Sequence, residues 1–238
     1  MNNVSDRVEY IRLEEKIYHD YCYDNYKLFE AGSWLHKPVK TVMDMMSYFE
    51  NKENVKVLDL GSGVGRNSIP IAQRLTLDGT KVVCVDFLDS AIQKLKQYSK
   101  EHNVEHIIQP YKSDIKDFNI LTYEYDFIVA VSSLEHVDTQ ESFENVLKRM
   151  ENGTKVEGIN CIIVNSEVEE FDADTGLKLD ALMEVNISTE QMMQKLRKVY
   201  KDWTDISVLI KPLEYQITRQ GKPVILKTKA ITFAVQKK

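Results

Sequence analysis

Residues 57–67 read VLDLGSGVGRN, and this stretch decides the fold. An apolar run that carries Asp59 leads into glycines at every second position, Gly61, Gly63 and Gly65. Because glycine has no side chain, a small molecule can lie directly against the backbone where a strand turns into a helix. The order of strand, glycine loop and helix predicts a nucleotide-binding α/β domain.

The spacing of the three glycines separates two kinds of nucleotide site. A dinucleotide fingerprint, Gly-x-Gly-x-x-Gly, needs its last glycine at position 66, where this chain has Arg66. The shorter Gly-x-Gly-x-Gly, preceded by Val-Leu-Asp-Leu, resembles the first motif of class I S-adenosylmethionine-dependent methyltransferases. This resemblance implies S-adenosylmethionine as the cofactor and methyl transfer as the activity. A nicotinamide-dinucleotide oxidoreductase is the less favoured alternative.

Composition narrows the class of protein. The 238-residue chain is 43% hydrophobic and carries 31 Lys and Arg against 37 Asp and Glu, a formal charge of −6. That charge argues against a nucleic-acid partner, because a protein that binds nucleic acid needs a basic face. The longest apolar runs are of strand length and the N-terminus lacks the pattern of a signal peptide, so no membrane span or export is expected. The three cysteines form no Cys-x-x-Cys pair, which fits a cytoplasmic location.

Strand and helix patterns alternate after residue 50. Strands are expected at 55–60, 81–86, 104–109, 126–131 and 160–165, and helices at 65–75, 89–102, 138–150 and 188–200. Ser188 and Gln191 form a capping-box pattern at the start of the last of these helices. Two β-rich runs, 204–217 and 223–235, are joined by a hairpin-type connection. We expect an α/β fold with the Rossmann-like, seven-stranded class I methyltransferase sheet, mostly parallel, its last strand antiparallel in a C-terminal hairpin and helices on both faces.

The first 50 residues differ from the rest of the chain. They hold a dense group of aromatic residues, including Trp34, before a helix expected at 38–49. These rings either pack N-terminal helices onto the sheet or form a lid whose aromatic face covers the sulfonium of the cofactor. We therefore divide the chain into an N-terminal helical cap or lid, 1–50, and a cofactor-binding methyltransferase domain, 51–238.

Acidic residues after the second and third strands support the glycine loop. Asp86 stands where a carboxylate can accept hydrogen bonds from both ribose hydroxyls. The resemblance implies that Asp114 accepts from the adenine amino group, with the backbone amide of Ile115 beside it. Asp114 can instead cap a turn.

Other residues around the loop have weaker assignments. The resemblance implies that Asp59 positions the amino group of the cofactor, although it can instead make a turn contact. Arg66 and Asn67 are candidates for the methionyl carboxylate or an anionic substrate, or are solvated surface. The complete predicted cofactor set is Trp34, Asp59, Gly61, Ser62, Gly63, Gly65, Arg66, Asn67, Asp86, Phe87, Asp114, Ile115, Val131 and Ser132.

The segment 125–136, YDFIVAVSSLEH, resembles the fourth methyltransferase motif and is expected to border the transferable methyl group. Methyl transfer needs an aligned nucleophile and exclusion of water but no covalent enzyme nucleophile. Glu135 and His136 are candidates for removing a proton from an acceptor, and a pocket-lining role is the alternative for His136. No metal site is expected, because the five histidines form no ligand cluster.

A narrower resemblance covers about 55–238. The motif at 59–68, DLGSGVGRNS, is similar to the tellurite-resistance methyltransferases. The segments 158–164 and 221–237 are similar to that family's fifth strand and terminal hairpin. The resemblance therefore supports the class of enzyme along most of the chain.

Three departures leave the acceptor open. Glu157 replaces a glycine of the family, the region 166–186 is acidic, and the aromatic N-terminus is long. The acidic run 167–172 is either a solvated loop or a feature that favours a cationic or neutral acceptor over an oxyanion. The function predicted is methyl transfer to a small-molecule acceptor. A non-catalytic S-adenosylmethionine-binding regulator is the alternative, a macromolecular acceptor is less favoured, and the sequence does not indicate the oligomeric state.

Overall fold

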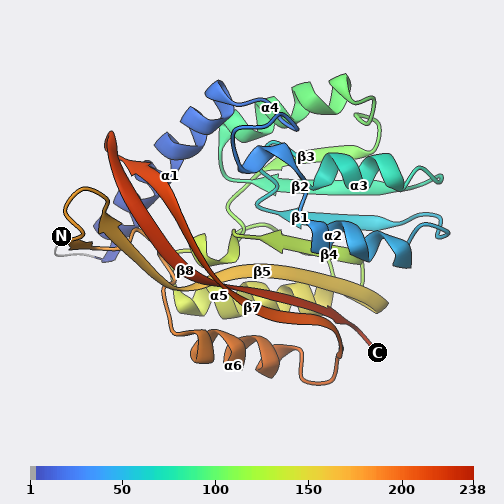
Figure 1. Cartoon of the computed structure of the whole chain (residues 1–238). Coiled ribbons are helices and arrows are strands. Elements are labelled where there is room, and N and C mark those ends of the chain that lie inside the picture. The colour runs from blue at the N-terminus through green and yellow to red at the C-terminus, as the bar shows by residue number, and fades with distance from the viewer. Residues whose placement is uncertain (1–3) are drawn as a thin grey trace.

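A computed structural model, which describes residues 4–238, organises the chain around one eight-stranded sheet (Figure 1). The sheet has the order β3-β2-β1-β4-β5-β8-β7, with the short β6 paired to β5. The strands are β1 Lys56–Leu60, β2 Lys81–Asp86, β3 Ile108–Lys112, β4 Tyr125–Val131, β5 Thr154–Asp172, β6 Lys178–Leu179, β7 Thr204–Arg219 and β8 Lys222–Gln236.

The sheet confirms the predicted fold class. Strands β3, β2, β1, β4 and β5 are joined by parallel pairings, whereas β8 is antiparallel to both β5 and β7. The chain builds β1, β2 and β3 outward and then returns to place β4 on the other side of β1. This reversal of strand order leaves a crevice beyond the carboxyl ends of β1 and β4, where ligands bind in folds of this kind.

Helices cover both faces of the sheet, as expected. Successive residues of the central strands are therefore buried in two cores, one on each side of the sheet. Val57 of β1 shares a core with Leu95 of α4, whereas the adjacent Leu58 shares the opposite core with Leu147 of α5 and Leu196 of α6. A strand buried on both faces reads as a continuous apolar run, which is why β1 was recognisable in the sequence. The helices are α1 Val4–Asn25, α2 Lys40–Asp44, α3 Ser68–Arg74, α4 Asp89–Glu101, α5 Gln140–Gly153 and α6 Thr189–Val199.

Two expected strand boundaries are wrong. Strand β3 begins at Ile108 and not at 104, because the amides of Ile107 and Ile108 both donate to the carbonyl of Val104 and close a turn. Strand β5 runs from Thr154 to Asp172 and not from 160 to 165, so the acidic run 167–172 is part of a strand and not a loop. That extension is possible because β8 pairs with β5 from Ile159 to Asp172, with one register shift.

Helix boundaries are closer to expectation. The capping box is confirmed, with Ser188 accepting from the amide of Gln191 and the Gln191 side chain accepting from the amide of Ser188. Helix α3 starts at Ser68 and not at 65, because the loop still turns through Asn67. Helix α2 ends at Asp44 and passes into a 3₁₀ turn that reaches Tyr48.

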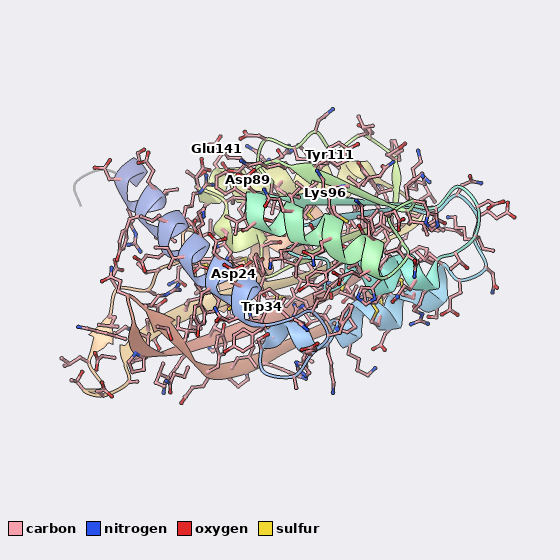
Figure 2. All side chains as sticks on the ribbon, turned by 90° about the horizontal axis from the view of Figure 1, so that it is seen from above. Asp24, Trp34, Asp89, Lys96, Tyr111 and Glu141 are labelled. Carbon is pink, nitrogen blue, oxygen red and sulfur yellow. The ribbon has the colours of Figure 1, made fainter. Side chains whose placement is uncertain are left out.

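Helix α1 is held between the C-terminal hairpin and α4. The tip of the β7–β8 hairpin reaches α1 in Figure 1, where the Gln220 side chain donates to the Tyr10 hydroxyl at 2.8 Å. On the other side the Ser90 hydroxyl donates to Asp20 at 2.5 Å. Figure 2 shows α1 beside α4, with Asp24 near the end of α1 and Asp89 at the start of α4. Residues 1–3 of the expected cap lie outside the described residues, and no helix from residue 4 onward is long and apolar enough to cross a membrane.

Gly65 illustrates how tightly α3 and α4 approach the loop. Its φ is +96°, and a Cβ there would lie 2.6 Å from Leu95 Cδ1. Gly221 at the hairpin tip has a comparable φ of +75° but nothing within 4 Å of a Cβ. We expect Gly65→Ala to lower the free energy of unfolding by about 2–4 kcal/mol and Gly221→Ala by about 1–2 kcal/mol. Chemical denaturation measures both, and equal losses would mean that packing at Gly65 is not limiting.

Candidate functional site

A cavity of about 730 Å³ lies at the carboxyl ends of the central strands. Helix α1 and the β7–β8 hairpin contribute to its walls, so parts of the chain far apart in sequence enclose one space. The structure brings most of the predicted site residues to this cavity. They are Trp34, Gly61, Ser62, Gly63, Arg66, Asn67, Asp86, Phe87, Asp114, Ile115, Val131, Ser132 and His136. Three predicted residues do not line it, namely Asp59, Gly65 and Glu135.

The glycine loop is pinned by backbone hydrogen bonds. The amides of Gly61 and Ser62 both donate to the carbonyl of Val85 at the end of β2, at 2.8 and 3.0 Å. Gly61 has a φ of +74°, and a Cβ there would lie 2.3 Å from the Cβ of Ser133. The Ser62 hydroxyl is buried without a hydrogen-bond partner among the described residues. The loop thus presents bare backbone and one unpaired polar atom at the cavity.

Asp86 joins the second strand to this loop. Its Oδ2 accepts from the amide of Gly63 at 2.8 Å, and its Oδ1 accepts from the amide of Leu88 at 2.9 Å. Burial raises the pKa of Asp86, and these amide hydrogen bonds offset part of the increase. A carboxylate offers about four acceptor positions, so Asp86 keeps capacity for further hydroxyl donors.

Asp59 lies behind the loop and not beside the cavity. It is 1% exposed and accepts from the Ser68 hydroxyl at 2.5 Å. Burial raises the pKa of Asp59 to about 6, against the opposing effects of the Ser68 hydrogen bond and the Arg66 charge. Asp59 therefore does not contact the cavity directly, and a role in positioning a cofactor amino group through the loop stays a prediction. Asp59 supports the first turn of α3.

Arg66 and Asn67 connect the loop to the N-terminal segment. The Arg66 guanidinium lies over the Trp34 ring, 5.0 Å from its centroid, and donates to the Trp34 carbonyl at 3.0 Å. The Asn67 side-chain oxygen accepts from the amide of Val39 at 2.9 Å. Trp34 lies just beyond the end of α1 in Figure 2, with its ring centroid 6.3 Å from that of Tyr23. Neither Arg66 nor Asn67 is solvated surface.

The third strand contributes Asp114 to the same cavity. Its Oδ1 accepts from the amide of Lys116 at 3.0 Å, which is the turn contact considered as an alternative. Its Oδ2 accepts from the Arg12 guanidinium at 2.8 Å. Phe87, which follows Asp86, is half exposed and faces the same guanidinium.

His136 lines the same cavity and has a partner that the sequence did not reveal. Its Nδ1 lies 3.0 Å from Oε2 of Glu184, a side chain that is 1% exposed. Burial alone lowers the pKa of His136, but the Glu184 hydrogen bond and the charges of Glu15 and Glu184 outweigh it and raise the pKa to about 9. His136 is therefore an imidazolium at neutral pH.

Glu135 does not reach the cavity, so its candidacy as a base is wrong. It is fully buried, and its Oε1 accepts from the backbone amide and the side-chain amide of Asn165 at 2.9 and 2.7 Å. Burial raises the pKa of Glu135, and the nearby His136 charge and Asn165 lower it in part. Glu135 instead fixes Asn165, which does line the cavity.

A second ion-pair group, at the wall of the cavity, links the hairpin to α1 and β5. Arg219 of the hairpin lies 2.8 Å from Glu15 of α1 and 3.1 Å from Glu170 of β5. Burial raises the pKa of Glu15, but the His19 hydrogen bond and the charges of His136 and Arg219 lower it to about 2. No local pattern in the sequence could have joined residues so far apart.

No residue of the acidic run 167–172 lines this cavity. Glu167 pairs with Lys229 at 2.7 Å, and Glu169 pairs with Lys178 at 2.5 Å. These two lysines and Arg219, which pairs with Glu170, offset three of the four carboxylates of the run, so the run gives little reason to exclude an anionic acceptor. Within residues 4–238 no group of three His, Cys, Asp or Glu side chains is arranged to hold a metal ion.

Comparison with known proteins decides the family. The sequence profile described as "Tellurite resistance protein TehB" matches residues 18–211. The chain belongs to the TehB family. A crystal structure of TehB from Haemophilus influenzae superposes with a TM-score of 0.63 at 24% identity, covering 92% of this chain and 67% of that one. This likeness supports the fold.

Sequence relatives are more limited in extent. This TehB-family chain is 30% identical over 148 residues to a "Probable S-adenosyl-L-methionine-dependent methyltransferase TehB" of Haemophilus influenzae, covering 62% of this chain and 46% of the relative. It is 30% identical over 105 residues to a "Ubiquinone biosynthesis O-methyltransferase" of Rickettsia bellii, and the match covers 44% of this chain and 41% of that relative. The chain thus matches less than half the length of these relatives. The cyclase SpnF shares the fold at a TM-score of 0.58 and 13% identity, so the fold alone does not specify methyl transfer.

The pKa of His136 tests the electrostatics of the site. Glu184→Gln removes the charge that holds the imidazolium, so the pKa of His136 should fall from about 9 by at least about one unit. NMR titration of labelled histidine measures the change. Glu169→Gln is the matched control, because Glu169 pairs with Lys178 outside the cavity and should leave His136 unaltered. If the pKa of His136 does not change in Glu184→Gln, Glu184 does not hold the imidazolium.

Proposed function

We propose that this TehB-family protein is an S-adenosylmethionine-dependent methyltransferase with a small-molecule acceptor. The observation that carries the proposal is that the glycine loop, Asp86 and His136 all line one cavity. The hydrogen bond from Gly63 to Asp86 holds the first two of these together at one end. The part of the cavity around His136 is left for an acceptor, and we call it the acceptor end.

The residues present fit the cofactor. Gly61 and Gly63 line the cavity without side chains of their own, and the unpaired Ser62 hydroxyl supplies a hydrogen-bonding atom. Asp86 would accept from ribose hydroxyls, and Asp114 and Phe87 would receive the adenine. When bound, S-adenosylmethionine supplies a methyl group already activated by the sulfonium.

The protein contributes alignment, exclusion of water and charge at the acceptor end. Because His136 is protonated at neutral pH, it can donate a hydrogen bond but cannot remove a proton. An acceptor that is already a nucleophilic anion, such as a thiolate or another soft anion, needs no base and would be stabilised by the imidazolium. We therefore favour an acceptor of this class over a neutral hydroxyl.

For the N-terminal 50 residues we favour a cap whose rings pack against the cavity wall. The Arg66 guanidinium already lies over the Trp34 ring. A sulfonium at the same ring would repel that guanidinium unless an anion lay between them. Trp34 therefore closes the wall and anchors Arg66. The N-terminal segment still limits access to the cavity through α1.

Two other functions compete with this proposal. A nicotinamide-dinucleotide enzyme lacks support, since Arg66 stands where its third glycine is required. A regulatory protein that binds S-adenosylmethionine without turnover would use the same loop. We place the protein in the cytoplasm, and we propose no nucleic-acid or membrane partner.

Turnover separates methyl transfer from regulation. Purified protein is mixed with methyl-labelled S-adenosylmethionine and a panel of thiols, soft oxyanions, phenols and amines, and S-adenosylhomocysteine is measured. We expect formation with an anionic soft acceptor, at a rate that decreases above about pH 9 as His136 loses its proton. Cofactor binding without turnover on the whole panel would favour the regulatory function.

Asp86 provides a test of the cofactor position. Asp86→Ala removes a charged acceptor and should weaken S-adenosylhomocysteine binding by about 1.5–3 kcal/mol, or roughly 10- to 150-fold. Asp89→Ala is the matched control, because Asp89 is an exposed carboxylate three residues away that pairs with Lys112 at 2.6 Å. Calorimetry measures both. Equal affinities for the two variants would remove Asp86 from the site.

A further inference from the structure

Arg12 of α1 contacts both groups that we assign to adenine. Its Nη2 donates to Oδ2 of Asp114 at 2.8 Å, in an ion pair whose side chains are 24% and 11% exposed. Its guanidinium carbon lies 5.2 Å from the centroid of the Phe87 ring. One side chain of α1 thus stacks on the ring and bonds the carboxylate at the same time.

A guanidinium and an adenine ring make the same kind of contact at this place. Both are flat, both stack on aromatic faces, and both present N–H donors in the plane of the ring system. An adenine that stacks on Phe87 and donates to Asp114 needs the space that the Arg12 guanidinium fills. The two groups therefore compete for one position.

A second carboxylate lies within reach of Arg12. Oε1 of Glu184 is 3.9 Å from Arg12 Nε, which is an ion-pair distance but too long for a hydrogen bond. This oxygen is buried without a hydrogen-bond partner among the described residues, and its side chain is 1% exposed. The other oxygen of Glu184 holds His136 at the acceptor end. A shift of the guanidinium toward Glu184 would satisfy the unpaired oxygen.

We propose that Arg12 is a positioning residue that blocks the adenine position and moves from Asp114 to Glu184 when cofactor binds. This inference rests on the proposed function. It assigns α1 a specific role, because one side chain then connects the cofactor end of the cavity to the Glu184–His136 pair. Cofactor binding would bring the Arg12 guanidinium beside the His136 imidazolium. The acceptor end would then hold two cations, which favours an anionic acceptor.

The sign of a change in affinity tests the competition. The apparent affinity for a ligand is reduced by the fraction of protein in which its position is blocked. Arg12→Ala should therefore tighten S-adenosylhomocysteine binding by about three- to tenfold in calorimetry. Arg7→Ala is the matched control, since Arg7 also tethers α1, through an ion pair to Asp180 at 2.6 Å, but does not line the cavity. Its affinity should equal that of the unaltered protein.

A residue that clamps adenine instead of blocking it gives the opposite result. Weaker or unchanged binding in Arg12→Ala would overturn the inference. Tighter binding in Arg7→Ala as well would also overturn it, because loosening of α1 would then explain the effect. Failure of the unaltered protein to bind S-adenosylhomocysteine would overturn the proposed function itself, so the two failures are distinguishable.

A double-mutant cycle with Glu184 tests where Arg12 goes. Glu184→Gln removes its second partner, so binding should weaken at least about threefold in the Arg12 protein and change little in the Arg12→Ala protein. Equal effects of Glu184→Gln in both backgrounds would overturn the shift. Arg12→Lys keeps the charge but loses the flat stacking group, and it should bind S-adenosylhomocysteine more tightly than the unaltered protein even if Arg12→Ala does not fold.

Discussion

The site depends on the backbone of the glycine loop being held against the second strand. Two amides of the loop, at Gly61 and Ser62, share the carbonyl of Val85, and the next glycine amide binds Asp86. These bonds require φ values that only glycine adopts without strain at positions 61 and 63. The loop, the carboxylate after β2 and the start of α3 therefore form one rigid unit, on which both ends of the cavity are built.

The acceptor end is organised by compensated charge. Glu184 and Glu15 hold His136 in its protonated form, and Arg219 balances Glu15 and the buried Glu170. Removing one partner from such a group leaves an uncompensated buried charge, which is far more costly than the group itself is stabilising. This explains why so many ionisable side chains are tolerated beside an apolar core.

The enclosure of the cavity depends on two elements from opposite ends of the chain. Helix α1 and the long β7–β8 hairpin meet beside the sheet, at the left of Figure 1, joined by Arg219 to Glu15 and by Gln220 to Tyr10. The hairpin can extend this far because β8 pairs with β5 well beyond the central sheet. The sheet core is common to the fold, whereas this pairing of helix and hairpin gives the cavity its particular lining.

The sequence by itself determined the parts whose signals are local. The glycine loop, Asp86 at the end of β2 and the capping box of α6 each depend on residues that are close in sequence or at a fixed place after a strand. The start of β3 was mispredicted because Val104 and Ile107 are apolar and buried in a turn, a situation that composition does not distinguish from a strand.

Only the tertiary structure decided which charged groups face the cavity. Glu135, adjacent to His136, lies beneath the cavity, whereas Glu184 and Arg12 reach it from distant segments. The spacing of residues along one strand or helix predicts which face each residue occupies. It does not predict which other element packs against that face. The largest charge effects that raise the pKa of His136, from Glu15 and Glu184, and the Arg12 charge that holds Asp114 come from other elements, so they became defined only when the chain folded.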